Sequence, residues 1–310
     1  MKVGFFGTPG IASYVLEKLC CRFDVVFLVA PSDKRCGRDL KLQHCAAKEA
    51  ALCHEVPVLQ PVSLKDPAFA ETLRGFGADI FVVVAYGRLI PASVFNIPPC
   101  GTINLHPSLL PKYRGAAPVE WALINGETVT GVTVQMINEE LDAGDIVLSG
   151  EIAIDGNMTA KELYEIVLPV GAGLVADAVE LLCSGGSINL VKQDHSQATW
   201  CGKIDNETAH IDWSTSAPAI HNLVRGLNPK PVAWTTFRGK HLKVWETRIF
   251  SEEAPAPAPG EIAVLHKKRL IAGTGNGIIE LVSLQPETKK RMDAAAFING
   301  YRLAPSERFE

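Results

Sequence analysis

The run Asp79–Ala85, DIFVVVA, limits the fold most, because it is continuously apolar and rich in β-branched residues. Such a strand has no polar face for water, so it must be covered on both sides of a sheet. Two further apolar runs, 2–6 and 25–30, flank a helical pattern at 11–19. Strands that alternate with helices predict βαβ units and a Rossmann-like, mainly parallel α/β sheet.

The predicted secondary structure changes after Lys203. Before it, 102–105 and 132–137 are predicted strands, and 160–182 is a long helical pattern that Pro169 could interrupt. After it, short strand-like pieces at 233–237, 242–245, 261–264 and 278–284 alternate with Gly, Pro and charged turns, which is typical of a small β-barrel. A length of 310 residues also favours two domains. We therefore expect a first domain at 1–190, a linker at 191–204 and a C-terminal domain at 205–310.

Charge and cysteine content exclude several classes. The net charge is −4, and residues 205–310 carry 14 Lys/Arg against 12 Asp/Glu, a balance of only +2, so nucleic-acid contact would need a local basic patch. The eight cysteines form no C-x-x-C pair, and no metal is expected. No run of eighteen apolar residues and no signal-peptide pattern is present, so we expect no membrane span and reduced thiols in a cytoplasmic protein.

A glycine loop follows the first strand, at Gly4, Gly7 and Gly10. A dinucleotide-binding fingerprint needs its first two glycines two residues apart, and Pro9 removes an amide that would face a phosphate. The spacing therefore indicates a tight strand-to-helix turn. A second glycine cluster, at 273–277, has the pattern of a hairpin turn.

The stretch 104–115, NLHPSLLPKYRG, carries the candidate chemistry. Asn104 and His106 are two residues apart, so on a strand both side chains project from one face, near the strand end where open α/β sheets bind ligands. An Asn amide can stabilise an oxyanion and a His can transfer protons near neutral pH. Asp142, in a polar loop before Gly144, is the best carboxylate partner for the imidazole. Asp145 is the alternative, whereas Glu139 and Glu140 are expected to be solvated.

A purely structural interpretation of these residues also stands at this point. A His beside a Pro is often structural, and an Asp-Ala-Gly-Asp run is often only a turn. The mutual geometry that would distinguish the two interpretations is not contained in the residues themselves.

Two separated motifs carry a resemblance to a known family. NLHPSLLPKYRGAAP followed by TGVTVQMINEELDAGDI is similar to the formyltransferases that use 10-formyltetrahydrofolate. Further pieces resemble the members that formylate a tRNA, namely FFGTP, QPVSL, VVVAYGRLIP and IDWS…LNPKPVAW. Together these pieces extend over almost the whole chain. The resemblance implies a formyltransferase domain followed by an OB-like β-barrel domain that helps to hold the tRNA.

The resemblance also implies roles for individual residues. The catalytic positions of the family fall on Asn104, His106 and Asp142. The residues expected to bind the folate co-substrate come from two loops: Ser108, Leu109, Leu110 and Pro111 from the first, and Tyr86, Gly87 and Leu89 from the second. A flat heterocycle favours such apolar walls and backbone polar groups.

The implied acceptor is the amino group of initiator methionyl-tRNA, giving N-formylmethionyl-tRNA for translation initiation. A basic loop of these members matches 31–41, where Lys34, Arg35, Arg38 and Lys41 are expected to contact the tRNA. The family run continues with a glycine and two lysines, whereas this chain has Asp-Leu-Lys at 39–41, which weakens the basic patch. We expect the protein to act as a monomer.

Rival functions remain open at this stage. A formyltransferase acting on an amino-sugar nucleotide can carry a similar second domain, although the basic loop is not expected there. A glycinamide ribonucleotide formyltransferase would end near the catalytic domain, and formyltetrahydrofolate hydrolases or dehydrogenases would carry other domains. A non-catalytic RNA-binding protein on the same scaffold is the alternative from another class, against which the joint presence of Asn104, His106 and Asp142 argues.

Overall fold

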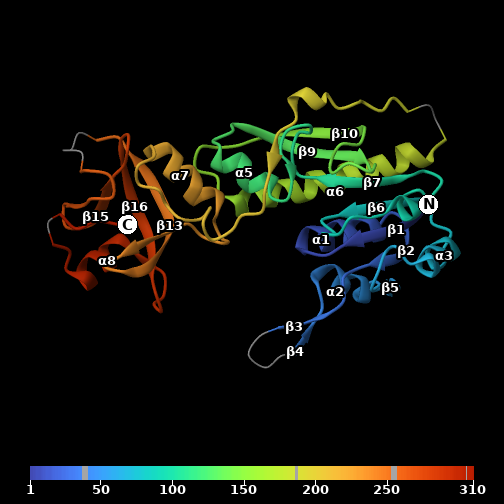
Figure 1. Ribbon diagram of the computed structural model, residues 1–310, viewed down its shortest axis with the longest axis horizontal. Coiled ribbons are helices and arrows are strands. Elements are labelled where there is room, and N and C mark those ends of the chain that lie inside the picture. Colours follow the sequence, from blue (N-terminus) through green and yellow to red (C-terminus); the bar gives the residue numbers. More distant parts are fainter. Residues whose placement is uncertain (37–40, 186–187, 253–256, 305) are drawn as a thin grey trace. The chain divides into compact units, whose positions relative to one another are not determined.

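The computed structural model describes residues 1–36, 41–185, 188–252, 257–304 and 306–310, without the side chains of 34–36 and 41–42 (Figure 1). The chain forms two compact units, which we describe separately. Unit 1 comprises Met1–Gly115, Gly131–Ile152 and Glu165–Trp200, and unit 2 comprises Ala116–Thr130, Ala153–Tyr164 and Cys201–Glu310. The last change of unit, after Trp200, falls within the predicted linker 191–204, and the domain boundaries themselves stay a prediction.

Unit 1 is built on a seven-stranded sheet of order β10-β9-β7-β6-β1-β2-β5 (Figure 1). The strands are β1 (Lys2–Gly7), β2 (Asp24–Val29), β5 (Val58–Leu59), β6 (Ile80–Val84), β7 (Thr102–His106), β9 (Val129–Met136) and β10 (Ile146–Ala153). The pairs from β5 through β2, β1 and β6 to β7 are parallel, and β7 pairs with β9 antiparallel. The mainly parallel sheet is confirmed, and β6, the apolar run, is buried at every residue.

Helices cover both faces of this sheet. On one face α3 (Pro67–Gly75) and α4 (Ala92–Phe95) pack through Leu73 and Phe95 on Phe6 and Phe81. On the other, α1 (Gly10–Cys20) contacts β1, β2 and β6, and α2 (Ala46–Cys53) contacts α1, β2 and β5. A Cβ on Gly4 would lie 2.3 Å from the Phe27 ring, so this glycine permits close packing. β1 ends at Gly7 and α1 begins at Gly10, which agrees with the tight strand-to-helix turn predicted there.

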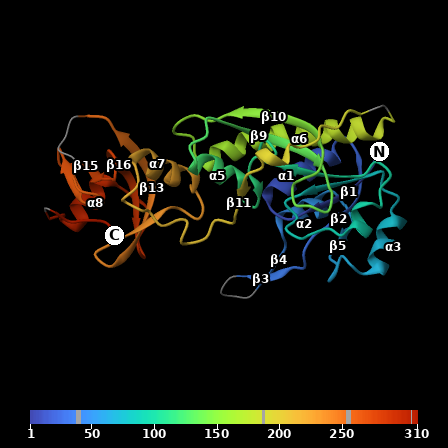
Figure 2. The ribbon, with the colours of Figure 1, turned by 45° about the horizontal axis from the view of Figure 1, so that its top comes forward.

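Helix α6 (Ala160–Cys183) runs along β7 and β9 (Figures 1 and 2). It continues through Pro169 without a break. By length and composition it could cross a membrane, a test that core helices of soluble proteins also pass. A Cβ on Gly171 would meet Leu105 at 3.1 Å and Val132 at 3.4 Å, so this part of α6 packs directly on the sheet, as a core helix does.

Unit 2 contains an antiparallel sheet of order β12-β13-β16-β15-β14, with β17 on β16 (Figure 2). The strands are β12 (Trp234–Phe237), β13 (Lys240–Phe250), β14 (Ile262–Leu265), β15 (Arg269–Gly273), β16 (Ile278–Pro286) and β17 (Met292–Asp293). The C-terminal antiparallel β domain is confirmed, although β15 was not predicted. The glycine cluster at 273–277 joins β15 to β16, as predicted for a hairpin turn.

Three helices accompany the sheet of unit 2. They are α5 (Pro118–Ile124), α7 (Ala217–Gly226) and α8 (Ala294–Tyr301). α7 begins at the N-cap Ser216, whose side chain accepts a hydrogen bond from the Ala219 amide, and its buried face includes Ile220 and Val224. These two residues join the strand residues Leu242 and Leu281 in one apolar core.

Candidate active site

The site lies at the end of β7, where Asn104 and His106 both reach one carboxylate. Asn104 is paired with Gln135 of the neighbouring strand β9, and His106 with Thr133. The Asn104 Nδ2 atom lies 3.4 Å from Asp142 Oδ1, and His106 Nδ1 lies 3.7 Å from Asp142 Oδ2. The predicted alternation therefore holds, and the three residues meet as expected.

The carboxylate belongs to Asp142, in the turn that follows β9. Its backbone is in the left-handed region, with φ of 51°, which is unfavourable for a side-chain-bearing residue. A Cβ on Gly144 would lie 1.7 Å from the Met136 carbonyl oxygen, so only glycine fits there, as the sequence predicted. Glu139 and Glu140 are exposed, also as predicted. The turn thus presents Asp142 rather than its acidic neighbours to β7.

Three N–H groups converge on the Asp142 carboxylate. Besides Asn104, Gln135 Nε2 donates to Oδ1 at 3.1 Å and the Gly115 amide donates to Oδ2 at 2.9 Å. The Asp142 side chain is only 9 % exposed, and that of His106 only 5 %. Hydrogen bonds to both of its oxygens hold the carboxylate in a fixed orientation.

The imidazole of His106 has a defined tautomer. Its Nε2 lies 2.8 Å from the carbonyl oxygen of Tyr113, and because a carbonyl oxygen can only accept, Nε2 carries the proton. Nδ1 is then the basic nitrogen, and it faces Asp142 at 3.7 Å, beyond a direct hydrogen bond. The ring can accept a proton at Nδ1 beside an anion that would stabilise the resulting imidazolium.

Three residues of the site were missed from the sequence. Gln135, Gln193 and Arg114 are buried polar side chains linked to the Asp142 turn. The position of Gln135 opposite Asn104 could have been found from a correct strand register. Gln193 comes from an irregular segment between α6 and the 3₁₀ helix His195–Gln197, where no periodicity points to a site.

The predicted folate loops differ in how they expose their residues. Ser108 is buried, and its hydroxyl donates to the Lys112 carbonyl at 2.6 Å, so its side chain holds its own loop. Leu110 is also buried, whereas Leu109 and Pro111 are partly exposed. In the other loop Tyr86 is buried, packed edge-on against Phe6.

Two leucines near the predicted site residues in sequence expose apolar surface. Leu89 is 75 % exposed, and Leu141, beside Asp142, is 55 % exposed. Gly87 has φ of 80°, and a Cβ there would meet nothing within 4 Å, so the backbone is open to a close approach. Among the described residues no group of three His, Cys, Asp or Glu is arranged to hold a metal ion.

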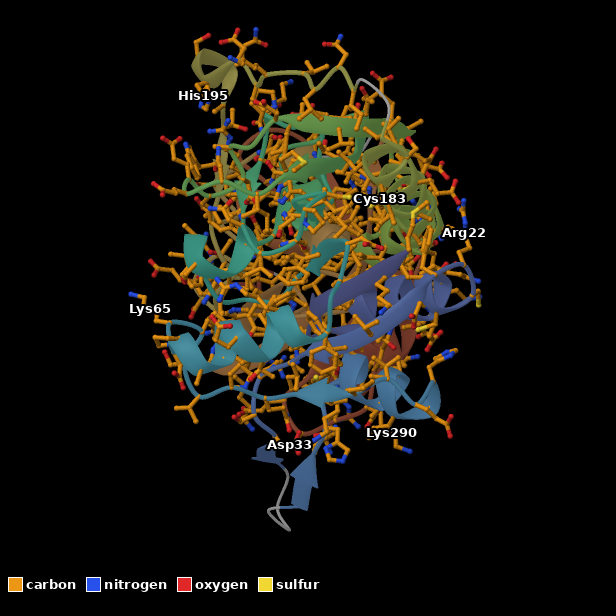
Figure 3. All side chains as sticks on the ribbon, turned by 90° about the vertical axis from the view of Figure 1, so that its right-hand side faces the viewer. Arg22, Asp33, Lys65, Cys183, His195 and Lys290 are labelled. Carbon is orange, nitrogen blue, oxygen red and sulfur yellow. The ribbon has the colours of Figure 1, made fainter. Side chains whose placement is uncertain are left out.

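Three of the four predicted tRNA-binding residues lie on two paired strands. β3 (Lys34–Cys36) pairs with β4 (Lys41–Gln43) antiparallel, so Lys34, Arg35 and Lys41 share this element. Their side chains, and Arg38 entirely, lie outside the described residues. Asp33 lies where the hairpin begins (Figure 3), 2.7 Å from Lys48 and 3.1 Å from His44.

Comparison with family models covers most of the chain. A formyl transferase model matches residues 2–179, and a model of the formyl transferase C-terminal domain matches residues 203–302. The methionyl-tRNA formyltransferase of Acetivibrio thermocellus is 39 % identical over 308 residues, covering 99 % of both chains. That of Solibacter usitatus is 42 % identical over 309 residues, covering 99 % of this chain and 98 % of the relative.

Solved structures share the fold at lower identity. An N-formyltransferase from Helicobacter canadensis, in complex with folinic acid and dTDP-3-aminofucose, is 19 % identical with a TM-score of 0.68, covering 93 % of this chain and 100 % of that one. HypX from Aquifex aeolicus, in complex with tetrahydrofolic acid, is 19 % identical with a TM-score of 0.64. The match covers 99 % of this chain but 48 % of HypX, so the chain spans about half the length of that protein.

The chain belongs to the formyl transferase family, whose enzymes use a formyl-tetrahydrofolate donor. Within the family it belongs with the methionyl-tRNA formyltransferases, the enzymes of translation initiation, because relatives of that kind match it at about 40 % identity over nearly its full length. The predicted resemblance is thereby confirmed. The full-length identity carries this assignment, since two-domain sugar formyltransferases share the fold at only 19 % identity.

Proposed function

We propose that this chain transfers the formyl group of 10-formyltetrahydrofolate to the α-amino group of initiator methionyl-tRNA. The observation that carries the proposal is the convergence of Asn104 and His106 on the buried Asp142 carboxylate, within a chain of this family. The donor supplies the formyl carbon. The chain supplies the groups that hold charge and move a proton at that carbon.

Asn104 is the oxyanion-stabilising residue in this proposal. One N–H of its amide points to Asp142 Oδ1, which fixes the plane of the amide. The other N–H can donate to the formyl oxygen as negative charge develops on it. A donor that is already oriented needs no reorganisation during the reaction, which is the basis of oxyanion-hole catalysis.

His106 and Asp142 handle the proton in this proposal. The attacking amine becomes positively charged when it bonds to the formyl carbon, so it must lose a proton. His106 Nδ1 is the basic ring nitrogen and can accept that proton, while Asp142 stabilises the imidazolium. The tetrahedral intermediate then collapses: the bond between the formyl carbon and the folate nitrogen breaks, and that nitrogen takes up the proton held at Nδ1 as tetrahydrofolate leaves. The two residues thus act as one proton-transferring pair, and no metal ion is required by this scheme.

The remaining roles extend the same proposal. Tyr86, Gly87 and Leu89 together with Ser108–Pro111 form the folate-binding walls, supported by the exposed Leu89 and the open backbone at Gly87. Lys34, Arg35, Arg38, Lys41 and the C-terminal OB-like domain bind the tRNA. We further propose that the protein works as a monomer in the cytoplasm.

Formyl transfer to methionyl initiator tRNA should be measured against methionyl elongator tRNA and an amino-sugar nucleotide, with 10-formyltetrahydrofolate as donor. The proposal expects the initiator tRNA to react fastest. Equal rates with both tRNAs would remove the initiator preference. Transfer to the sugar nucleotide alone would favour the alternative function, and tRNA binding without turnover would favour a non-catalytic RNA-binding protein.

The oxyanion role has its own test. Asn104→Ala should lower kcat by ~10²–10³, the usual loss when one oxyanion donor is removed. Asn96→Ala, at an exposed asparagine of the same unit, serves as the matched control. An Asn104→Ala enzyme that retains nearly the full rate would remove Asn104 from this role.

A further inference from the structure

A buried glutamine, Gln193, lies behind the Asp142 turn and is bonded to its backbone. Its side-chain nitrogen Nε2 donates to the Asp142 carbonyl at 3.0 Å and to the Gly144 carbonyl at 2.7 Å. Gln193 is 6 % exposed, so these bonds are made away from water. One amide therefore fastens both ends of the turn whose first residue has the unfavourable φ of 51°.

The same nitrogen also reaches the side chain that orients the carboxylate. Gln193 Nε2 lies 3.1 Å from Gln135 Oε1, and Gln135 Nε2 donates to Asp142 Oδ1 at 3.1 Å. Gln193 Nε2 carries two hydrogens for these three oxygens, so one N–H is shared between two of them. Because an amide oxygen only accepts, the contact with Gln193 Nε2 requires the oxygen end of the Gln135 amide there and leaves its nitrogen to face Asp142. Gln193 thus controls Asp142 by two routes, through its backbone and through Gln135.

Arg114 determines the orientation of Gln193. Its Nε and Nη2 atoms lie 3.2 Å and 2.6 Å from Gln193 Oε1, and a guanidinium has donors only, so the amide oxygen must face Arg114 and the nitrogen must face the turn. Arg114 is 2 % exposed, and within the described part of the chain it makes no ion pair with a carboxylate. Its other neighbours are His195 Nδ1 at 3.4 Å and the Trp200 ring at 5.7 Å.

We propose that Gln193, held by Arg114, is a positioning residue that fixes the Asp142 carboxylate for the reaction. This inference rests on the proposed catalytic role of Asp142. Gln193 itself need not touch either substrate, because its bonds end on the Asp142 turn and on Gln135. A displacement of about 1 Å in such a group can cost on the order of 10²-fold in rate.

Gln193→Leu is the first test, because leucine keeps the apolar volume but can neither donate nor accept. We expect kcat for formyl transfer to methionyl-tRNA to fall ~10–100-fold, with KM for the tRNA and for the folate donor unchanged. Gln285→Leu is the matched control, since Gln285 also uses both ends of its amide, bonding Trp245 Nε1 and the Lys289 carbonyl in unit 2. The control should keep the wild-type kcat. An unchanged kcat in Gln193→Leu would overturn the proposal.

A double-mutant cycle separates positioning from general damage to the fold. If Gln193 acts through Asp142, Gln193→Leu should cause no further loss of kcat in an Asp142→Ala background. An equal loss in both backgrounds would overturn the proposal. Arg114→Met should reproduce part of the Gln193→Leu effect on kcat and add little to it, because both act on one amide; full additivity would contradict the role of Arg114.

The failure of this inference is distinct from the failure of the proposed function. If the wild-type chain does not formylate methionyl-tRNA, the proposed function fails. If the wild type is active and Gln193→Leu folds with wild-type kcat, only the positioning role fails. Thermal unfolding of each variant shows which molecules are folded at the assay temperature, and kcat is then expressed per folded molecule.

Discussion

Among the described residues each unit buries one histidine, His106 in unit 1 and His221 in unit 2, and the two are hydrogen-bonded in different ways. In unit 2 both ring nitrogens of His221 are engaged, Nδ1 with the Thr247 hydroxyl at 3.0 Å and Nε2 with the Gly156 carbonyl at 3.2 Å. Arg225 donates to the Asp155 and Met158 carbonyls, both at 3.1 Å. In unit 1, by contrast, only one nitrogen of His106 is bonded, and the other faces a carboxylate at 3.7 Å.

The backbone conformation also differs between the two clusters. Asp142 and Tyr113, which surround His106, have φ of 51° and 59°, whereas His221 and Arg225 lie on the regular helix α7. A cluster whose polar atoms are all hydrogen-bonded, on a regular helix, holds a loop in place. A cluster with an unbonded ring nitrogen, next to residues of unfavourable φ, leaves groups available for chemistry. The comparison teaches that burial of a histidine alone does not mark a site.

The largest expected effect separates the two histidines. His106→Ala should lower kcat by ~10²–10⁴, the usual contribution of a general acid or base. His221→Ala should leave kcat unchanged, while removing two buried hydrogen bonds and lowering the Tm. Steady-state formylation and thermal unfolding of both variants measure these outcomes. The contrast between a catalytic His106 and a structural His221 is contradicted if His221→Ala loses activity while it remains folded, or if His106→Ala keeps the wild-type rate.

The second prediction concerns Arg225, whose guanidinium donates to two backbone carbonyls. Arg225→Met leaves the carbonyls of Asp155 and Met158 without their donor, and each unsatisfied buried group costs about 1–3 kcal/mol. We therefore expect a destabilisation of about 2 kcal/mol in urea unfolding, with kcat per folded molecule unchanged. Arg248→Met, on an exposed arginine of the same unit, is the control and should have little effect. Loss of kcat without loss of stability would show that Arg225 is not merely structural.

Much of this contrast could not be predicted from the sequence. The apolar run 79–85 and the alternation of Asn104 with His106 predicted the parallel sheet and the shared face, because strand periodicity is a local property. Gln193 contacts the Asp142 turn, and Arg114 contacts Gln193, through packing between segments that lie far apart in the chain, and no local pattern encodes such contacts. The missed strand β15 is short, and its sequence RLIAG lacks strict alternation.

The third prediction uses the pH dependence of stability. Burial lowers the pKa of His221 below its ordinary value of about 6.5, so the folded state binds this proton less readily than the unfolded chain. Stability is then lost as the pH falls through 6.5 towards the lower pKa of the folded state, by at most about 1.4 kcal/mol per pH unit for one proton. His221→Gln should flatten this slope in unfolding experiments between pH 5 and 7. An identical slope in both proteins would remove His221 as its cause.

The smallest effect is expected at a third cluster, in unit 1, where the side chains of Asp33 and Lys48 are partly buried, with exposures of 15 % and 12 %. The Lys48 ammonium, then the Gln60 amide and His44, lowers the pKa of Asp33 to about 2. This carboxylate therefore contributes stability above its ordinary pKa of about 4, and the contribution is lost as the pH falls towards 2. Asp33→Asn should remove that step from acid unfolding and leave the Tm at pH 7 within about 2 °C, because an ion pair that solvent still reaches contributes little. Asp24→Asn, an exposed aspartate of the same unit, is the control. A large loss of Tm at pH 7 would mean that the number of hydrogen bonds in such a cluster, rather than its burial, decides how much it stabilises the fold.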